Sequence, residues 1–491
     1  MTNVHIRVKD SASNRPTPVR LCISDPAGKT YPPLGRLAEF ATGRNEDVGG
    51  HLLLNGKHYC YIDGSCEAPL PAGIPLTFDI SKGPEYSPVR QVVTLGPGQM
   101  ALRFAIERWR DQHAAGWYTG DTRCHFLSPH AALLEAQAED LAVVQLLATE
   151  IGLATSPGKV VPAIPNMIAF SGQQPALTAP ASVVAVNTLN RHPVLGMLAL
   201  LHCHRAVYPL SVGGADATDD WSLADWCDQC HRKKGLVVWA EAFESEAGIA
   251  PEALADLILG RIDAVECTSA SARLRDWYRA WSAGLRFALA GASAKDSNRT
   301  ALGAMRTYAH VSAEMSFMLS DWIEAVRAGR TFVTSGPMLQ FTVDGQLPGA
   351  LLDRGPGAPP LKLRASVESS TPPGQLEIVA NGEAIASAAP ASAPPYSAEV
   401  EFEHDLPAGG WLAARCLAAP TTDGFAHTSP VFVRSGGRLL RDAELCRKFG
   451  EQIGSTIDWV NAHGRFEVPR RKEALLALLE EARQKMARVE A

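Results

Sequence analysis

The middle of the chain constrains the fold most, because short apolar runs alternate with helical patterns between about residues 117 and 335. An apolar run without polar interruption is typical of a strand in a parallel sheet that is covered on both faces. Repeated strands and helices over such a length indicate an α/β barrel or an open doubly wound sheet. The candidate strands are residues 141–148, 183–187, 235–240, 264–267 and 286–291.

Two helices can be placed between these strands. A crossover helix is predicted to open at Pro251, because Leu254, Leu257 and Ile258 follow at helical spacing and proline is favoured in a first turn. Residues 221–234 predict a second helix directly before the strand at 235–240.

The two flanks of this region follow a different period. Apolar residues alternate with polar ones in residues 1–110, for example at Val4 and Val8, and again in residues 336–435. Alternation of period two predicts strands with one face packed and the other face in water. We therefore expect two small β-sandwiches around an α/β centre at residues 111–335.

The remaining residues, 436–491, predict a helical tail. One face of its last helix is apolar, and the opposite face carries glutamate, arginine and lysine. Such an apolar face must pack on its own protein or on a partner subunit. Its members are Leu475, Leu479, Ala482 and Met486.

Composition narrows the class of protein. The chain has 491 residues, enough for about three domains. Its formal net charge of -6 disfavours a dedicated nucleic-acid binder. No stretch approaches the length of a membrane span, and the first residues alternate like a strand rather than forming an apolar signal core. We therefore expect a soluble, cytoplasmic protein that binds neither nucleic acid nor membrane, with its ten cysteines as free thiols.

Several separated motifs carry a family resemblance. Residues 117–122 read Trp-Tyr-Thr-Gly-Asp-Thr, and residues 123–129 read Arg-Cys-His-Phe-Leu-Ser-Pro. This stretch resembles the metal motif Gly-Asp-Thr-His-x-His, followed by Phe-Leu-Ser-Pro, of the carbaryl-hydrolase-type (CehA/McbA) branch of the PHP metallohydrolases. Further stretches fit the same family in the same order. They are residues 134–139, 190–191, 277–278, 306–308 and 328–337.

The resemblance covers about residues 1–435 and implies both a fold and a chemistry. The fold would be a distorted (β/α) PHP-type barrel between two β-sandwiches, with a cluster of divalent metals (Zn, Mn or Fe) at the barrel mouth. A metal at such a site lowers the pKa of a bound water and polarises a scissile carbonyl or phosphoryl group.

Most positions that the resemblance assigns to metal ligands carry other residue types in this chain. Asp121 and His125 keep theirs. The substituted positions are Arg123, Met197 and Glu241 in place of histidines, Leu189 in place of a glutamate, and Ala294 in place of an aspartate, with Asp296 as its nearest substitute. Leucine has no donor atom, a thioether suits hard metals poorly, and a guanidinium repels a cation. We therefore expect no bound metal, with His125 and Asp121 as the ligands if one is held.

Two functions remain open at this point. In the first, the chain is a PHP-fold pseudoenzyme that acts as a partner subunit or binds a small molecule through Asp121, Arg123, Arg191 and Asp296. Its partner would be a second copy of the chain or an active relative. In the second, the chain is a hydrolase of an ester, carbamate or phosphoester with a reduced or metal-free site. His125, Glu241 and Lys295 would then be catalytic, Lys295 as a desolvated base after a strand end.

Three other signals have plainer interpretations. Residues 227–231 read Cys-Asp-Gln-Cys-His, which matches a haem-attachment pattern and offers three zinc ligands without a fourth; we interpret it as a coincidence on a helix. His202 and His204 are interpreted as a loop pair. Glu244 and Glu246 follow a strand end and are interpreted as a solvated acidic loop.

Overall fold

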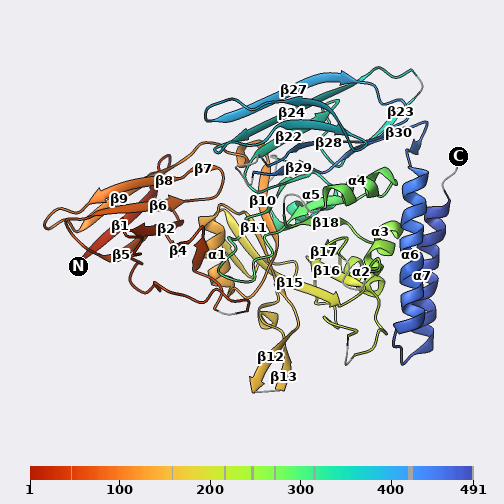
Figure 1. Ribbon diagram of the computed structural model, residues 1–491, viewed down its shortest axis with the longest axis horizontal. Coiled ribbons are helices and arrows are strands. Elements are labelled where there is room, and N and C mark those ends of the chain that lie inside the picture. Colours follow the sequence, from red (N-terminus) through yellow and green to blue (C-terminus); the bar gives the residue numbers. More distant parts are fainter. Residues whose placement is uncertain are drawn as a thin grey trace.

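The computed structural model describes residues 1–45, 47–156, 159–214, 217–244, 248–269, 273–312, 317–355, 357–418 and 424–488. It is a mixed α/β structure with several sheets and, among these residues, seven α-helices. Figure 1 shows the N-terminal strands at one end of an elongated molecule and two C-terminal helices at the other, with the mixed centre between them. No described helix has the length and apolar character needed to cross a membrane.

The N-terminal region consists of strands in two sheets, which confirms the prediction that it is all-β. The first sheet has the order β5-β1-β9-β7, and the second has the order β3-β4-β2-β6-β8. Alternate apolar side chains of β1, β2 and β6 meet in one core. The strands are β1 (Thr2–Asp10), β2 (Val19–Ser24), β3 (His51–Leu54), β4 (Lys57–Ile62), β5 (Ser65–Leu70), β6 (Pro75–Ser81), β7 (Tyr86–Ser87), β8 (Val89–Thr94) and β9 (Ala101–Arg108).

The centre is built on a sheet that contains all five predicted strands. Their bounds, with those of two neighbours, are β10 (Trp117–Cys124), β11 (Val143–Ala148), β15 (Ser182–His192), β16 (Gly196–Leu201), β17 (Leu236–Ala240), β18 (Ala264–Cys267) and β19 (Ala288–Gly291). β10, β11 and β15 pair in parallel, and so do β17, β18 and β19. β16 runs antiparallel to both β15 and β17.

The predicted strands thus lie in parallel pairs, but β16 makes the central sheet mixed rather than parallel throughout. β15 ends at His192 and β16 begins at Gly196, and so short a connection can join only antiparallel strands. Near-continuous apolar character indicated burial on both faces correctly, but it carries no information on strand direction.

The two ends of this series approach each other. Cys124 at the end of β10 forms an isolated parallel bridge with Lys295, which follows β19. The amide of His125 donates to the carbonyl of Lys295 over 2.7 Å. Outside this bridge, β10 pairs antiparallel with β20 (Arg306–His310), which continues to β21 (Thr331–Thr334). The carboxyl ends of β10, β11, β17 and β19 consequently gather at one edge.

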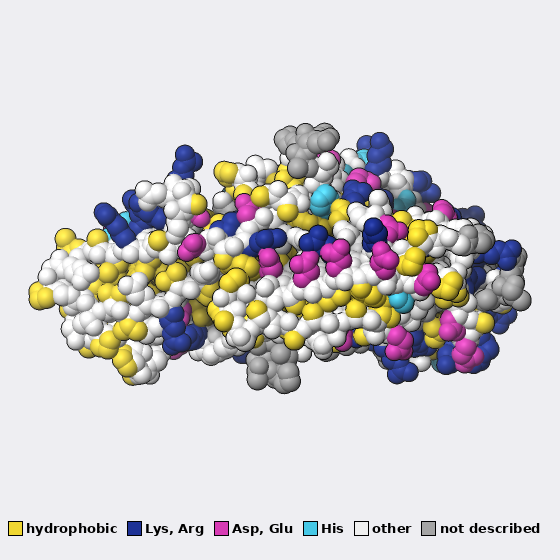
Figure 2. Space-filling view, turned by 90° about the horizontal axis from the view of Figure 1, so that it is seen from above, with side chains coloured by type: hydrophobic (Ala, Val, Ile, Leu, Met, Phe, Trp, Pro, Cys, Tyr) yellow, Lys and Arg dark blue, Asp and Glu magenta, His cyan; other side chains and the backbone are white. Residues whose placement is uncertain are grey.

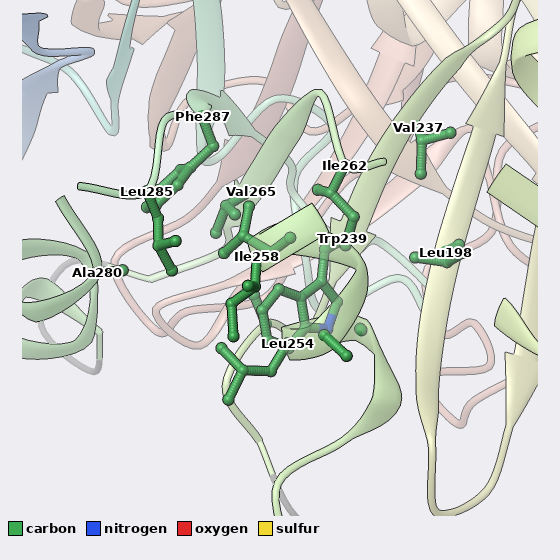
Figure 3. Packing of buried hydrophobic residues seen from close by; sticks show 14 of the residues in the cluster. Leu198, Val237, Trp239, Leu254, Ile258, Ile262, Val265, Ala280, Leu285 and Phe287 are labelled. Atoms are coloured by element: carbon green, nitrogen blue, oxygen red, sulfur yellow. The ribbon is translucent and has the colours of Figure 1, made fainter. Parts of the chain in front are cut away.

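Helices cover the outside of this sheet. They are α1 (Pro129–Ala138), α2 (Leu223–Arg232), α3 (Glu252–Leu259), α4 (Leu274–Ser282) and α5 (Leu319–Arg327). α2 and α3 confirm the two predicted helices, and α2 opens with a capping box in which Ser222 and Asp225 exchange hydrogen bonds. Figure 3 shows Trp239 of β17 packed with Leu254 and Ile258 of α3 in one apolar cluster.

A second all-strand region follows the centre and confirms the period-two prediction there. It contains β22 (Met338–Val343), β24 (Leu361–Ser369), β25 (Leu376–Ala380), β27 (Tyr396–His404), β28 (Gly410–Cys416) and β30 (Val431–Ser435), with shorter strands β23 (Leu351–Arg354), β26 (Glu383–Ala388), β29 (Ala426–Thr428) and β31 (Arg438–Leu439). The outer face of β24 and β27 is charged: Figure 2 shows basic and acidic side chains side by side there, and Arg364 pairs with Glu399 over 2.6 Å.

The predicted helical tail is a hairpin of α6 (Ala443–His463) and α7 (Pro469–Ala487). α6 packs against α3 and α4, and α7 packs against α3. The apolar face of α7 is buried in the same cluster as Trp239 and Leu254. Of the two alternatives left open by the sequence, packing on the chain's own protein is therefore the observed one.

Candidate functional site

A cavity of about 360 Å³ opens where the carboxyl ends of the central strands gather. This edge is where open and closed α/β sheets usually bind their ligands. Residues after β10, β11, β17 and β19 reach it, and the N-terminal region adds one wall. The lining residues are Arg44, Asn45, Arg123, His125, Phe126, Thr149, Glu150, Ile151, Leu189, Arg191, Met197, Glu241, Ala294 and Asp296.

Arg123 is the central charge of this cavity. Its Nε and Nη2 donate to the two carboxylate oxygens of Glu266 over 2.7 and 2.8 Å, and its Nη1 lies 3.4 Å from Glu241 Oε1. The side chains of Arg123 and Glu266 are 7% and 1% exposed. Burial opposes the charge of Arg123, yet the carboxylates of Glu266 and Glu241 raise the pKa of the guanidinium above its usual value. The result is a bidentate, buried ion pair at the cavity floor.

The carboxylate of Asp121 contacts the backbone of Arg123 and makes no ion pair with its guanidinium. One of its oxygens accepts from the amides of Arg123 and Ser293, and the other accepts from the amide of Gly303 over 2.8 Å. Burial raises the pKa of this carboxyl, although the hydrogen bonds oppose the shift. Asp121 therefore holds three backbone segments together, and its oxygens are engaged.

His125 presents one ring nitrogen to the cavity. Its Nδ1 lies 3.1 Å from the carbonyl oxygen of Leu147. Because a carbonyl only accepts, Nδ1 must carry the hydrogen, which leaves Nε2 with its lone pair in the neutral ring. Burial, with the charge of Arg123, lowers the pKa of His125 to about 4. At neutral pH the ring is therefore an uncharged acceptor.

Three cavity-lining residues that follow strand ends, none of them glycine, adopt left-handed backbone conformations. The φ angles are 66° at Phe126, 50° at Glu241 and 52° at Ala294. Each follows the end of a strand and lines the cavity. Conformations of this kind cost on the order of 1 kcal/mol each and concentrate at functional sites. Their common location marks this edge of the sheet as a functional-site candidate.

The remaining predicted binding residues lie at the rim. Asp296 pairs with Arg44, whose side chain is 82% exposed. Arg191 is exposed at the end of β15 and makes no ion pair with any side chain in the described part of the chain. A second cavity of about 290 Å³ adjoins the first and shares Arg44, Arg191 and Glu241 with it.

Lys295 lies away from the cavity, contrary to the role of catalytic base considered for it. Its ammonium donates to the carbonyls of Ser297 and Thr300 and lies 3.5 Å from Glu135 Oε2, with no exposed side-chain surface. Burial raises the pKa of Glu135, and the charge of Lys295 opposes that shift. The strand end that turns Ala294 toward the cavity turns the next side chain toward α1, so Lys295 is a structural residue.

The donor set does not fit the metal cluster that the resemblance implies. A guanidinium lies where cations would be held, Leu189, Met197 and Ala294 offer no hard donor, and the oxygens of Asp121 are engaged by amides. Across the described residues, no group of three histidine, cysteine or acidic side chains could hold a metal ion.

Glu266 is the residue that sequence reasoning missed. It lies within β18, whose sequence Ala-Val-Glu-Cys was interpreted only as an apolar strand. A carboxylate inside a strand with four buried residues needs a cationic partner, and that requirement was the available signal. The partner itself, Arg123, is 143 residues away in sequence.

The other residues singled out in the sequence do not form a second site. His231 pairs with Asp263 over 3.0 Å, while Cys227 and Cys230 are buried in the core, so the three do not converge. His202 lies in a loop after β16, as predicted. Glu244 pairs with Arg273 and lines the second cavity. Glu246 lies outside the described residues.

Comparisons of the chain with protein-family models, with curated proteins and with solved structures found no match.

Proposed function

We propose that this chain is a metal-free relative of the PHP metallohydrolases that binds a small molecule in the cavity at the strand ends. On this proposal the centre is a distorted (β/α) barrel between two β-sandwiches. The observation that carries it is the Arg123–Glu266 pair, because a permanent, buried cation fills the position where a metal-dependent relative needs a metal.

The grouping of the substituted positions supports the family assignment. Of the seven positions that the resemblance aligned with ligands, six line one cavity although they are spread over 172 residues of sequence, and the seventh, Asp121, is buried and bound by backbone amides. The six are Arg123, His125, Leu189, Met197, Glu241 and Ala294. Unrelated positions in a chain of 491 residues have no reason to meet in this way.

The chemistry of the cavity supports binding more than hydrolysis. A general base works best when its pKa is near the operating pH, and burial lowers the pKa of His125 to about 4. Lys295 is directed elsewhere. Hydrolysis of an ester, carbamate or phosphoester would then depend on His125 and Glu241 alone. A cavity of about 360 Å³, in contrast, lies within the size range of small-molecule sites.

Metal analysis tests the proposal directly. We expect purified protein to hold less than one metal per chain by elemental analysis, and to keep the same Tm with and without chelator. A Cys230→Ser variant distinguishes zinc on thiols from metal in the cavity. Two or more bound metals per chain would contradict the proposal, and so would turnover of an aryl carbamate, ester or phosphoester that disappears in His125→Ala.

A further inference from the structure

Some charged side chains of the cavity have no partner in the observed ion pairs. Arg123 is taken by Glu266, and Arg44 by Asp296. Arg191 then remains as a guanidinium without an ionic partner among the described side chains. Because its side chain is exposed at the wall common to both cavities, it can accept an anionic group from solvent at little cost in desolvation.

Two carboxylates of the cavity are also available to a ligand. Glu150, two residues after the end of β11, makes no ion pair in the described chain. Glu241 is 43% exposed and has only the 3.4 Å contact with Arg123, which is already held by Glu266. Apart from the ion pairs of Arg123 and Arg44, the cavity offers the positive charge of Arg191 and the negative charge of Glu150 to a ligand, and Glu241 adds a carboxylate that is only weakly held by Arg123.

The floor adds a hydrogen-bond acceptor and the walls add apolar surface. The Nε2 lone pair of His125 makes no hydrogen bond within the described chain and belongs to a side chain that is nearly completely buried. The atom can be reached from the cavity and can accept from a donor there, such as an ammonium N–H. Leu189, Met197 and Ile151 form apolar parts of the lining, against which an aliphatic or aromatic group can pack.

We propose that the cavity binds a small zwitterion of the α-amino-acid type, with its carboxylate on Arg191, its ammonium between His125 Nε2 and the carboxylates of Glu150 and Glu241, and its side chain on the apolar wall. This inference rests on the proposed function and specifies its ligand class. A ligand with only one of the two charges would leave the other side of the cavity unpaired.

Isothermal titration calorimetry of the intact protein tests this assignment. The probes are glycine, leucine and phenylalanine, with two matched half-ligands of leucine: 4-methylpentanoate, which lacks the ammonium, and isoamylamine, which lacks the carboxylate. We expect leucine or phenylalanine to bind at least tenfold more tightly than either half-ligand. Failure of all three amino acids to bind at millimolar concentration would overturn the inference, and so would a half-ligand that binds as tightly as leucine.

Two variants of cavity-lining residues, the exposed Arg191 and the half-buried Glu150, assign the contacts. Arg191→Gln should weaken leucine binding at least tenfold while leaving isoamylamine unchanged, and Glu150→Gln should weaken both leucine and isoamylamine. Arg103→Gln on β9, an exposed arginine remote from the cavity, serves as the matched control and should change nothing. If Arg191→Gln weakens both probes equally, the assignment is wrong.

Metal analysis of the same preparations separates the two levels of the proposal. Metal-free protein that binds none of the amino acids retains the proposed function and overturns only this ligand class. Protein that contains two metals per chain overturns the proposed function itself, whatever the probes do.

Discussion

At the scale of single residues, Arg123 determines the character of the cavity. A guanidinium stays protonated in proteins and holds a carboxylate with two parallel hydrogen bonds. Glu266 receives both bonds, and a third contact reaches Glu241. The sequence shows acidic residues at two other ligand positions, Asp121 and Glu241. It could not identify Glu266 as the main partner, because nothing local shows which buried strand lies opposite.

Removing the cation tests how much this pair contributes to stability. Arg123→Ala leaves the carboxylate of Glu266 buried without a counter-charge, which costs roughly 3–5 kcal/mol for a fully buried pair. Urea unfolding followed by circular dichroism measures the change. The double variant Arg123→Met with Glu266→Gln removes both charges and should recover most of the loss. Equal stability of Arg123→Ala and the parent would contradict the assigned role.

At the scale of elements, α3 is unusual because it carries two buried carboxyl groups. Glu252 and Asp256 lie one turn apart, both fully buried. Glu252 Oε1 accepts from the amide of Ala224 at the start of α2, but its Oε2 and both oxygens of Asp256 have no hydrogen-bond partner in the described chain. Burial raises the pKa of Glu252 to about 7, and burial together with the charge of Glu252 raises the pKa of Asp256 well above its usual value.

This helix was predicted from its apolar spacing and its opening proline, both of which are local signals. Its two carboxyls were not recognised as buried, because the face that they occupy is closed by α2 and by the C-terminal hairpin, elements that the sequence does not place. β16 escaped prediction for a related reason: its apolar run does not reveal that it returns antiparallel after a short turn.

The raised pKa values predict a specific dependence of stability on pH. A carboxyl whose pKa is higher in the folded state stabilises the fold fully below its unfolded pKa of about 4, and this contribution is lost as pH rises through the folded pKa. For Glu252 that range extends from about 4.5 to about 7. We therefore expect the Tm to fall between pH 5 and pH 8.

Neutral substitution of the less satisfied carboxyl provides the test. Asp256→Asn should raise the free energy of unfolding at pH 8 by on the order of 1 kcal/mol and should flatten the pH dependence of the Tm. Glu383→Gln, at an exposed position of β26, a strand that does not pack against α3, is the control and should leave the pH dependence of the Tm unchanged. If Asp256→Asn instead destabilises the protein at pH 8, other groups must compensate the charge of ionised Asp256, and the prediction is wrong.

At the scale of the whole molecule, the N-terminal region is tied to the centre by buried polar contacts rather than by a linker. Arg108 of β9 pairs with Glu85 over 2.7 Å and with Asp140 over 2.8 Å. Glu85 also accepts from the hydroxyl of Tyr308 in β20. Asn298 holds the loop that carries Arg44 to the cavity by donating to the carbonyls of Ala41 and Asp47. The all-β character of each flank was readable from alternation, but these long-range partners were not.

These contacts predict that the N-terminal region and the centre unfold together. All ten tryptophans lie at residue 109 or beyond, so tryptophan fluorescence reports on the rest of the molecule, while far-UV circular dichroism also reports the N-terminal strands. We expect the two transitions to coincide in the parent protein. Arg108→Ala leaves Glu85 and Asp140 without their cation and should lower the free energy of unfolding by roughly 3 kcal/mol, the cost for a buried pair. Both midpoints should therefore fall together. A variant in which dichroism shifts while fluorescence does not would instead identify the N-terminal region as an independently unfolding domain, because only the signal from residues 1–108 would then have moved.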